Sequence, residues 1–288
     1  MILKSSLKYI ILKKDNLVYK ISKQKNKTNI LKEYKLLKKL RNDVRYLNLL
    51  PKLYKIEKIK IGIFKGNYFY RQNFIKGQTF SNEVKNKRYN YIKSLFLLVS
   101  KKLIFICQNA KKDANINQEN FIKKIFQEEL KSIKKNTDLN SLISAKKIII
   151  NNKKYNSLSD YLQKIFSSYD YRQATKYFKI CKNEHWNFHG DNVLIDKNDV
   201  KIIDPDTSID FNDSFFSFSR FLYSYIHDTC FYKKYLIETN NFIFCKKQYK
   251  FRLKTIWSSQ ANKNYSILSK FINENKYSNN IFIKKLNL

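Results

Sequence analysis

The pattern of apolar and polar positions predicts a strand-rich first part of the chain. Residues 7–22 alternate between the two classes on both sides of Asp15-Asn16, which is typical of two strands joined by a tight turn. Residues 27–42 place their apolar side chains at helical spacing. Residues 53–75 again favour strands. The first quarter of the chain therefore predicts strands, one helix and further strands.

The pattern changes after Gly77 to longer helical segments. These are expected at residues 88–110, 118–135, 155–183 and, for the most part, from 214 to the end. Between them, VLID and VKII on either side of KND predict a short hairpin within residues 185–206. We therefore expect an α+β protein with a small lobe at 1–76 and a larger, helical lobe at 77–288.

Composition limits the function classes. The chain carries 58 Lys plus Arg against 23 Asp plus Glu, a formal net charge of +35. Such charge favours nucleic-acid or anionic-membrane partners. The abundance of Lys, Asn, Ile, Phe and Tyr also indicates an AT-rich genome, which lessens the weight of the charge. We expect no obligatory nucleic-acid partner, and peripheral contact with an anionic membrane stays open.

Cysteine usage and hydropathy indicate an intracellular protein. The four cysteines are scattered without the spacing of metal ligands, as expected of reduced thiols. No apolar run has the length of a membrane span, and the N-terminal residues lack the apolar core of a signal peptide. We expect a cytoplasmic protein with no transmembrane segment.

One acidic window contrasts with this basic background. Residues 184–213 hold eight acids, only two bases and two of the three histidines. The predicted hairpin would bring Asn192 and Asp204 to one edge, where their hard oxygens suit Mg²⁺. His189 and Asp191 precede the first strand and are placed to orient an attacking hydroxyl. The window predicts metal-assisted phosphate chemistry.

The same window resembles a known family. His185 to Ile195 reads HWNFHGDNVLI, and Ile203-Asp204 follows. This pattern resembles the catalytic and metal-binding loops of aminoglycoside phosphotransferases and choline kinases, in the protein-kinase-like superfamily. The resemblance implies a two-lobed protein-kinase-like fold, ATP and Mg²⁺ as cofactors, and Asn192 and Asp204 as metal ligands.

The catalytic base departs from the family pattern. The position of the family's catalytic Asp falls on Asn187, which cannot accept a proton as a carboxylate does. A second register takes His189-Gly190-Asp191 as the H-x-D motif and puts Asp196 in the metal-binding amide position, but it disrupts the hairpin. We prefer the first register, with Asp191 as a substitute base and Asn187 and His189 as the other catalytic candidates.

The first lobe offers nucleotide-binding candidates. By resemblance, Lys20 is the strand lysine that contacts the ATP phosphates, and Glu33 is its helix partner. The segment YFYRQNFIKG resembles the family's hinge, with Gln72, Phe74 and Ile75 facing adenine. A glycine-rich phosphate loop is missing from this sequence.

Together these features predict transfer of the γ-phosphoryl group of ATP to a hydroxyl of a small molecule or sugar. Choline or ethanolamine, an aminoglycoside or a surface-polysaccharide sugar are the candidate acceptors. Two alternatives stay open. A pseudokinase-like binding module is favoured by Asn187 and by Ser217, which replaces an acid of the family pattern. A basic nucleic-acid-binding protein is disfavoured by the acidic window, which repels phosphate without a metal.

Overall fold

The computed structural model forms two compact units. One comprises Met1–Lys112 and Cys181–Thr229, and the other Asp113–Ile180 and Cys230–Leu288. The structure describes residues 2–5, 8–23, 26–85, 87–113, 116–117, 120–121, 123–124, 127–128, 131, 135, 145–150, 152–167, 178–227, 243–245, 248–251 and 259–275. Within these ranges no helix is long and apolar enough to cross a membrane.

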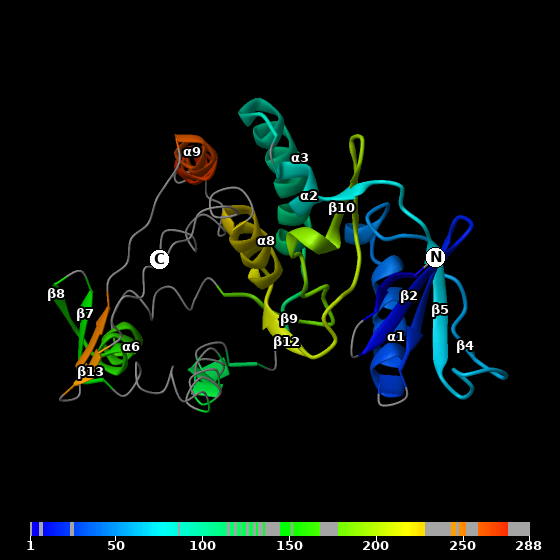
Figure 1. The fold of residues 1–288 in the computed structure, drawn as a ribbon, viewed down its shortest axis with the longest axis horizontal. Coiled ribbons are helices and arrows are strands. Elements are labelled where there is room, and N and C mark those ends of the chain that lie inside the picture. The colour runs from blue at the N-terminus through cyan, green and yellow to red at the C-terminus, as the bar shows by residue number, and fades with distance from the viewer. Residues whose placement is uncertain are drawn as a thin grey trace. The chain divides into compact units, whose positions relative to one another are not determined.

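The first unit begins with an antiparallel five-stranded sheet in the order β1-β2-β3-β5-β4 (Figure 1). Its strands are β1 (Ile2–Ser5), β2 (Tyr9–Lys14), β3 (Leu17–Ser22), β4 (Glu57–Lys58) and β5 (Tyr68–Asn73). Lys14 pairs with Leu17, so Asp15 and Asn16 form the predicted two-residue turn, with Asp15 at a φ of 54°.

Helix α1 (Lys27–Arg41) packs against this sheet, as the helical spacing predicted. It buries Ile30, Leu37 and Leu40, which recur at helical intervals. Glu33 is buried on the same helix and directs a carboxylate toward the sheet. The turn η2 (Val44–Tyr46) follows the helix.

A second small sheet carries the predicted hairpin. Strands β10 (Val193–Asp196) and β11 (Asp199–Ile202) pair as expected, and β6 (Gln78–Thr79) adds to the edge of β10. Gly77 lies directly before β6. A Cβ atom there would lie 1.9 Å from the carbonyl oxygen of Ile195, so only glycine allows this close approach.

The rest of the first unit is mainly helical. It contains α2 (Phe80–Val84), α3 (Tyr89–Gln108), η3 (Gly190–Asn192) and α8 (Phe216–Ile226), with a short pair of strands, β9 (Ile180–Lys182) and β12 (Phe211–Asp213). Aromatic side chains fill the space between the helices. Phe80 and Phe96 both contact Phe221 and Tyr225, and all four are fully buried.

The second unit contains a four-stranded sheet in the order β13-β14-β7-β8. Its elements are β7 (Lys147–Ile150), β8 (Lys153–Asn156), α6 (Leu158–Ser167), β13 (Ile243–Cys245), β14 (Gln248–Phe251) and α9 (Ser259–Asn275). Strand β14 runs parallel to β7, and the other pairings are antiparallel.

The structure differs from two of the sequence expectations. The helix expected across 155–183 is wrong at both ends, where β8 and β9 lie, and the tail contains strands β13 and β14. Short apolar segments such as Ile180-Cys181, both fully buried, fit a strand or a helix equally well by periodicity. Much of the helix expected at 118–135 lies outside the described residues.

Candidate active site

A buried lysine lies at the centre of the candidate site. Lys20 projects from β3, and its ammonium nitrogen lies 2.7 Å and 2.9 Å from the two carboxylate oxygens of Glu33. Tyr70 is the partner of Lys20 across β3 and β5, and its hydroxyl donates to the same carboxylate. Burial by itself lowers the pKa of Lys20, but the carboxylates of Glu33 and Asp204 outweigh it and raise that pKa above the ordinary value. Lys20 is therefore a fixed positive charge.

Asp204 closes the group from the end of the hairpin. Its carboxylate accepts a hydrogen bond from Lys20 while keeping 44% of its side-chain surface exposed. The residue has a φ of 59°, a left-handed conformation that Asp tolerates better than most residues and that often occurs at functional sites. The backbone thus directs this carboxylate toward the lysine and leaves part of it accessible.

The two ends of the hairpin are joined at their base, as the sequence predicted. The backbone nitrogen of Ile203 donates to the carbonyl of Asn192 at 2.9 Å, and Val193 pairs with Ile202. Asn192 and Asp204 consequently lie at the same end of the hairpin. Asp196, the metal-binding candidate of the second register, lies at the opposite end, where it pairs with Asp199.

Asn187 links the loop before the hairpin to Asp204. Its side-chain amide donates to the backbone carbonyl of Asp204 at 2.9 Å. The backbone carbonyl of Asn187 accepts from the side-chain amide of Asn192 at 3.4 Å. A carboxylate in place of this amide has no hydrogen to donate. Asn187 therefore fits a bracing residue better than a general base.

His189 and Asp191 flank the turn η3. The Nδ1 atom of His189 accepts from the backbone nitrogen of Asp191 at 3.4 Å, so this ring nitrogen caps the turn. The Asp191 carboxylate keeps 63% of its side-chain surface exposed, and the residue lines a cavity together with Asn192 and Asp204. Asp191 is the accessible carboxylate among the proposed catalytic residues.

Two cavities meet at Lys20 and Asp204. The first has a volume of about 400 Å³ and a largely apolar lining. Its walls include Val18, Gln72, Phe74, Ile75, Leu194 and Ile203. All three hinge candidates of the sequence therefore line the same cavity as both metal candidates. A flat aromatic ring suits such a lining.

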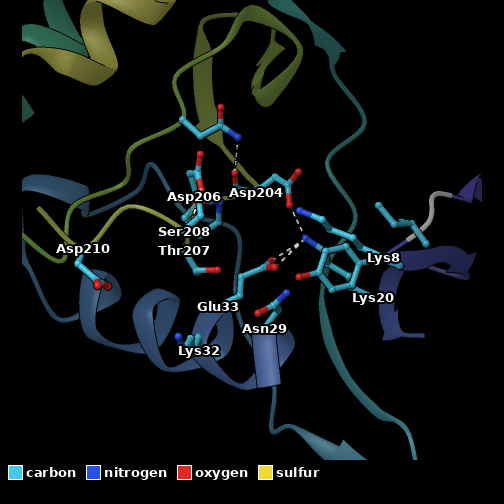
Figure 2. Close-up of a pocket in the computed structure, with 14 residues that line it drawn as sticks. Lys8, Lys20, Asn29, Lys32, Glu33, Asp204, Asp206, Thr207, Ser208 and Asp210 are labelled. Carbon is cyan, nitrogen blue, oxygen red and sulfur yellow. Dashed lines mark hydrogen bonds and ion pairs between the residues drawn. The ribbon is translucent and has the colours of Figure 1, made fainter. Parts of the chain in front are cut away.

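The second cavity, of about 420 Å³, is polar and is shown in Figure 2. The first part of the chain contributes Lys8, Lys20, Asn29, Lys32 and Glu33 to its lining, and the segment 187–210 contributes Asn187, Asp204, Asp206, Thr207, Ser208 and Asp210. Figure 2 shows the Lys20 ammonium directed toward the carboxylates of both Glu33 and Asp204. The polar lining fits phosphates and a hydroxyl-bearing acceptor.

Asp206 is held as an anion beside this cavity. Partial burial acts to raise its pKa, but hydrogen bonds from Ser208 and the guanidinium of Arg220 outweigh it and hold the pKa below the usual range. The Arg220 nitrogen lies 3.2 Å from the Asp206 carboxylate. Asp206 is thus already paired.

The donor set at the hairpin end fits magnesium. Asn192 uses its amide nitrogen toward Asn187, which leaves the amide oxygen available to a cation, and Asp204 offers a partly exposed carboxylate. Among the described residues no cluster of three or more His, Cys, Asp or Glu side chains is positioned to hold a metal. Such an incomplete set suits Mg²⁺, which is usually bound by one or two carboxylates plus substrate phosphates.

The sequence did not reveal a buried network that anchors the loop. Arg45 donates to both Glu184 carboxylate oxygens, at 2.8 Å and 3.0 Å, and the Tyr46 hydroxyl donates to Glu184 at 2.7 Å. The same hydroxyl accepts from the backbone nitrogen of His185 at 3.2 Å. Ser217, where the family pattern has an acid, donates to the His185 carbonyl at 2.7 Å.

The scarcity of arginine in the sequence is a signal that could have pointed to this network. The chain has seven arginines among 58 basic residues. Among the arginines that the structure describes, Arg45, Arg71 and Arg220 pair with carboxylates. In a lysine-rich chain, arginine marks positions where the planar guanidinium is needed.

Comparison with known proteins gives structural neighbours only. No family model and no curated protein matches the sequence. The structure is similar to choline kinase LicA from Streptococcus pneumoniae, with 16% identity and a TM-score of 0.43, over 77% of this chain and 66% of that one. It is also similar to spectinomycin phosphotransferase APH(9)-Ia, solved with ADP and spectinomycin, with 11% identity and a TM-score of 0.37, over 74% and 64%.

Both neighbours are kinase-like phosphotransferases of the kind that the loop motif resembles. The matched region spans about two thirds of the length of each. The structure itself mixes helices and strands, as expected for an α+β protein.

Proposed function

We propose that this protein is an ATP-dependent phosphotransferase that moves the γ-phosphoryl group to a hydroxyl of a small molecule or sugar. One observation carries the proposal. The buried Lys20 bridges Glu33 and Asp204 at the junction of an apolar cavity and a polar cavity. Phosphoryl transfer requires mainly positioning and neutralisation of charge, and this group supports both.

In this proposal ATP spans the two cavities. Adenine occupies the apolar one, against Gln72, Phe74 and Ile75, and the phosphates extend past Lys20. The nucleotide would then lie between the first sheet and the hairpin, both of which belong to the first compact unit.

Asn192 and Asp204 would hold Mg²⁺ on the phosphate side. When bound, the metal neutralises charge on the phosphate oxygens. Lys20 adds a second cation, kept in place by Glu33. The acceptor would lie in the polar cavity, where hydroxyl, amide and charged side chains are available to bind a sugar or an amino alcohol.

Asp191 is the proposed base that orients the acceptor hydroxyl. Its carboxylate is exposed and lines the apolar cavity with both proposed metal ligands, so the acceptor hydroxyl would reach it where the two cavities meet at Asp204. Asn187 is assigned a bracing role because its amide donates to the Asp204 carbonyl.

A pseudokinase-like nucleotide-binding module is the second candidate. It is favoured by Asn187, because the family pattern has its catalytic Asp at this position of the loop. Such a module would bind nucleotide in the same cavities without turnover.

The experiment is ATP binding by calorimetry, with and without Mg²⁺, followed by an acceptor screen that detects a phosphorylated product. Asp204→Asn should remove the Mg²⁺-dependent part of binding. Asp196→Asn is the matched control, because this acid lies at the far end of the same hairpin. Failure of the wild-type protein to bind ATP in any condition would reject both candidates, whereas binding without a product from any acceptor would favour the pseudokinase.

A further inference from the structure

The loop at residues 59–67 exposes two isoleucines. It joins β4 to β5 and leaves the edge of the first sheet (Figure 1). Ile63 is 93% exposed and Ile61 is 86% exposed, the highest values among the large apolar residues that the structure describes. Isolated exposed apolar residues are common, but two that flank one glycine at a loop tip form a local apolar point.

Backbone hydrogen bonds fix the shape of this loop. Ile59 donates to the carbonyl of Asn67 at 2.8 Å and accepts from Gly66 at 2.8 Å, and Lys65 donates to Gly62 at 2.9 Å. Gly62 and Gly66 have φ angles of 84° and 83°, which other residues rarely adopt. The backbone of this closed turn therefore holds both isoleucines in exposed positions.

Lysines surround the apolar tip. Lys58, Lys60 and Lys65 are exposed on or beside the loop. Glu57 is the one acid in the sequence from 55 to 67, and its carboxylate already pairs with Arg71 at 2.7 Å. The tip is thus apolar at its point and cationic at its base.

We infer that this loop docks the protein on an anionic lipid surface. Ile61 and Ile63 would enter the boundary between headgroups and acyl chains, and the lysines would contact the lipid phosphates. A lipid surface fits better than a protein groove because the tip is convex. Its cations also lie directly beside the apolar residues, just as the charged headgroups of a bilayer lie beside its acyl chains. A nucleic acid would use the lysines but gain nothing from exposed isoleucines.

The test is co-sedimentation of the full chain with vesicles of phosphatidylcholine alone or mixed with phosphatidylserine. We expect binding to the anionic vesicles only. The Lys58→Gln, Lys60→Gln, Lys65→Gln triple variant should lose roughly a hundredfold in affinity. The Ile61→Ser, Ile63→Ser double variant should lose at least about tenfold.

Matched controls separate the loop from the general basic charge. Val44→Ser with Leu47→Ser removes two other exposed apolar residues, and Lys35→Gln, Lys38→Gln, Lys39→Gln neutralises exposed lysines of α1. Both should bind as the wild type does. Equal losses in the loop and control variants, or no binding to anionic vesicles, would overturn the inference.

A second measurement does not depend on loss of binding. Ile63→Trp should show a blue-shifted emission, relative to the wild type, when anionic vesicles are added, together with quenching by brominated lipid. Vesicle binding without either change would show that the tip does not insert and would also reject the inference.

Discussion

The ammonium of Lys20 and the carboxylate of Glu33 form a buried ion pair with an N–O distance of 2.7 Å between the sheet and helix α1. The lysine is 6% exposed and the glutamate 2%. Since Lys20 also donates to Asp204, the pair connects three segments that are far apart in the sequence. We expect the ion pair to affect both the stability of the fold and the affinity for ATP, and mutations of Lys20 and Glu33 distinguish the two effects.

Lys20→Met should lower both stability and ATP affinity. The variant leaves the Glu33 carboxylate buried without its cation, which costs about 3–5 kcal/mol of unfolding free energy. Adding Glu33→Gln should restore much of that stability because no fully buried charge is then left unpaired, while Asp204 is partly exposed to solvent; ATP affinity should stay low. Urea unfolding and calorimetry measure the two effects.

Lys14→Met is the control for this cycle, because Lys14 lies exposed at the end of β2. It should change neither quantity appreciably. Additive destabilisation by the two mutations of the pair would contradict the proposed coupling.

Asn187→Asp and Asp191→Asn should have opposite signatures. The first replaces the amide that donates to the Asp204 carbonyl, so it should weaken Mg²⁺-dependent ATP binding rather than restore a base. The second should leave ATP binding intact and lower kcat by about a hundredfold or more, as expected for a general base. Steady-state kinetics, paired with calorimetry, distinguishes them. A faster enzyme after Asn187→Asp would show instead that position 187 supplies the base.

Local patterns were sufficient to predict the elements that form the site. The turn at Asp15-Asn16, the helix that carries Glu33 and the hairpin between Asn192 and Asp204 depend on neighbours close in sequence. Each has a clear period or turn signal. The pairing of Lys20 with Glu33, expected from the family resemblance, is confirmed by the structure.

Contacts between distant segments left no such signal. Tyr70 reaches Glu33 from another strand, and Arg45 reaches Glu184 across 139 positions. Neither residue type identifies its partner, although the scarcity of arginine in this chain singles out Arg45. The short strand at Ile180–Lys182 was not predicted for a related reason, because it pairs with Phe211–Asp213, which is distant in the sequence.

The Arg45–Glu184 network predicts a large stability effect from a single amide. Glu184→Gln should cost roughly 2–4 kcal/mol, because Arg45 loses a bidentate carboxylate in the interior and keeps Asp43 as its anionic partner. Glu57→Gln makes the same chemical change at an exposed pair with Arg71 and should cost less than about 1 kcal/mol. Chemical unfolding of both variants tests this, and similar values for the two would contradict a buried anchoring role.

His185 predicts how stability depends on pH. Burial lowers the pKa of this fully buried imidazole to about 4, although Asp204 and Asp206 act to raise it. The unfolded chain, with a pKa near the ordinary value of about 6.5, binds the proton more readily. The contribution of His185 is therefore complete above that value and is lost as the pH falls from there toward 4.

The loss attributable to His185 amounts to about 2 kcal/mol between pH 7 and pH 5. In the wild type, His185 Nδ1 accepts a hydrogen bond from the backbone nitrogen of Asn187 at 3.4 Å. His185→Asn keeps an acceptor for this hydrogen bond and should flatten the pH dependence of stability by about 2 kcal/mol. His189→Asn changes an exposed histidine and should leave the profile unchanged. Urea unfolding of the three proteins at both pH values measures the difference. An unaltered slope in His185→Asn would mean that other groups cause the acid sensitivity, and that the imidazole is not held neutral by burial.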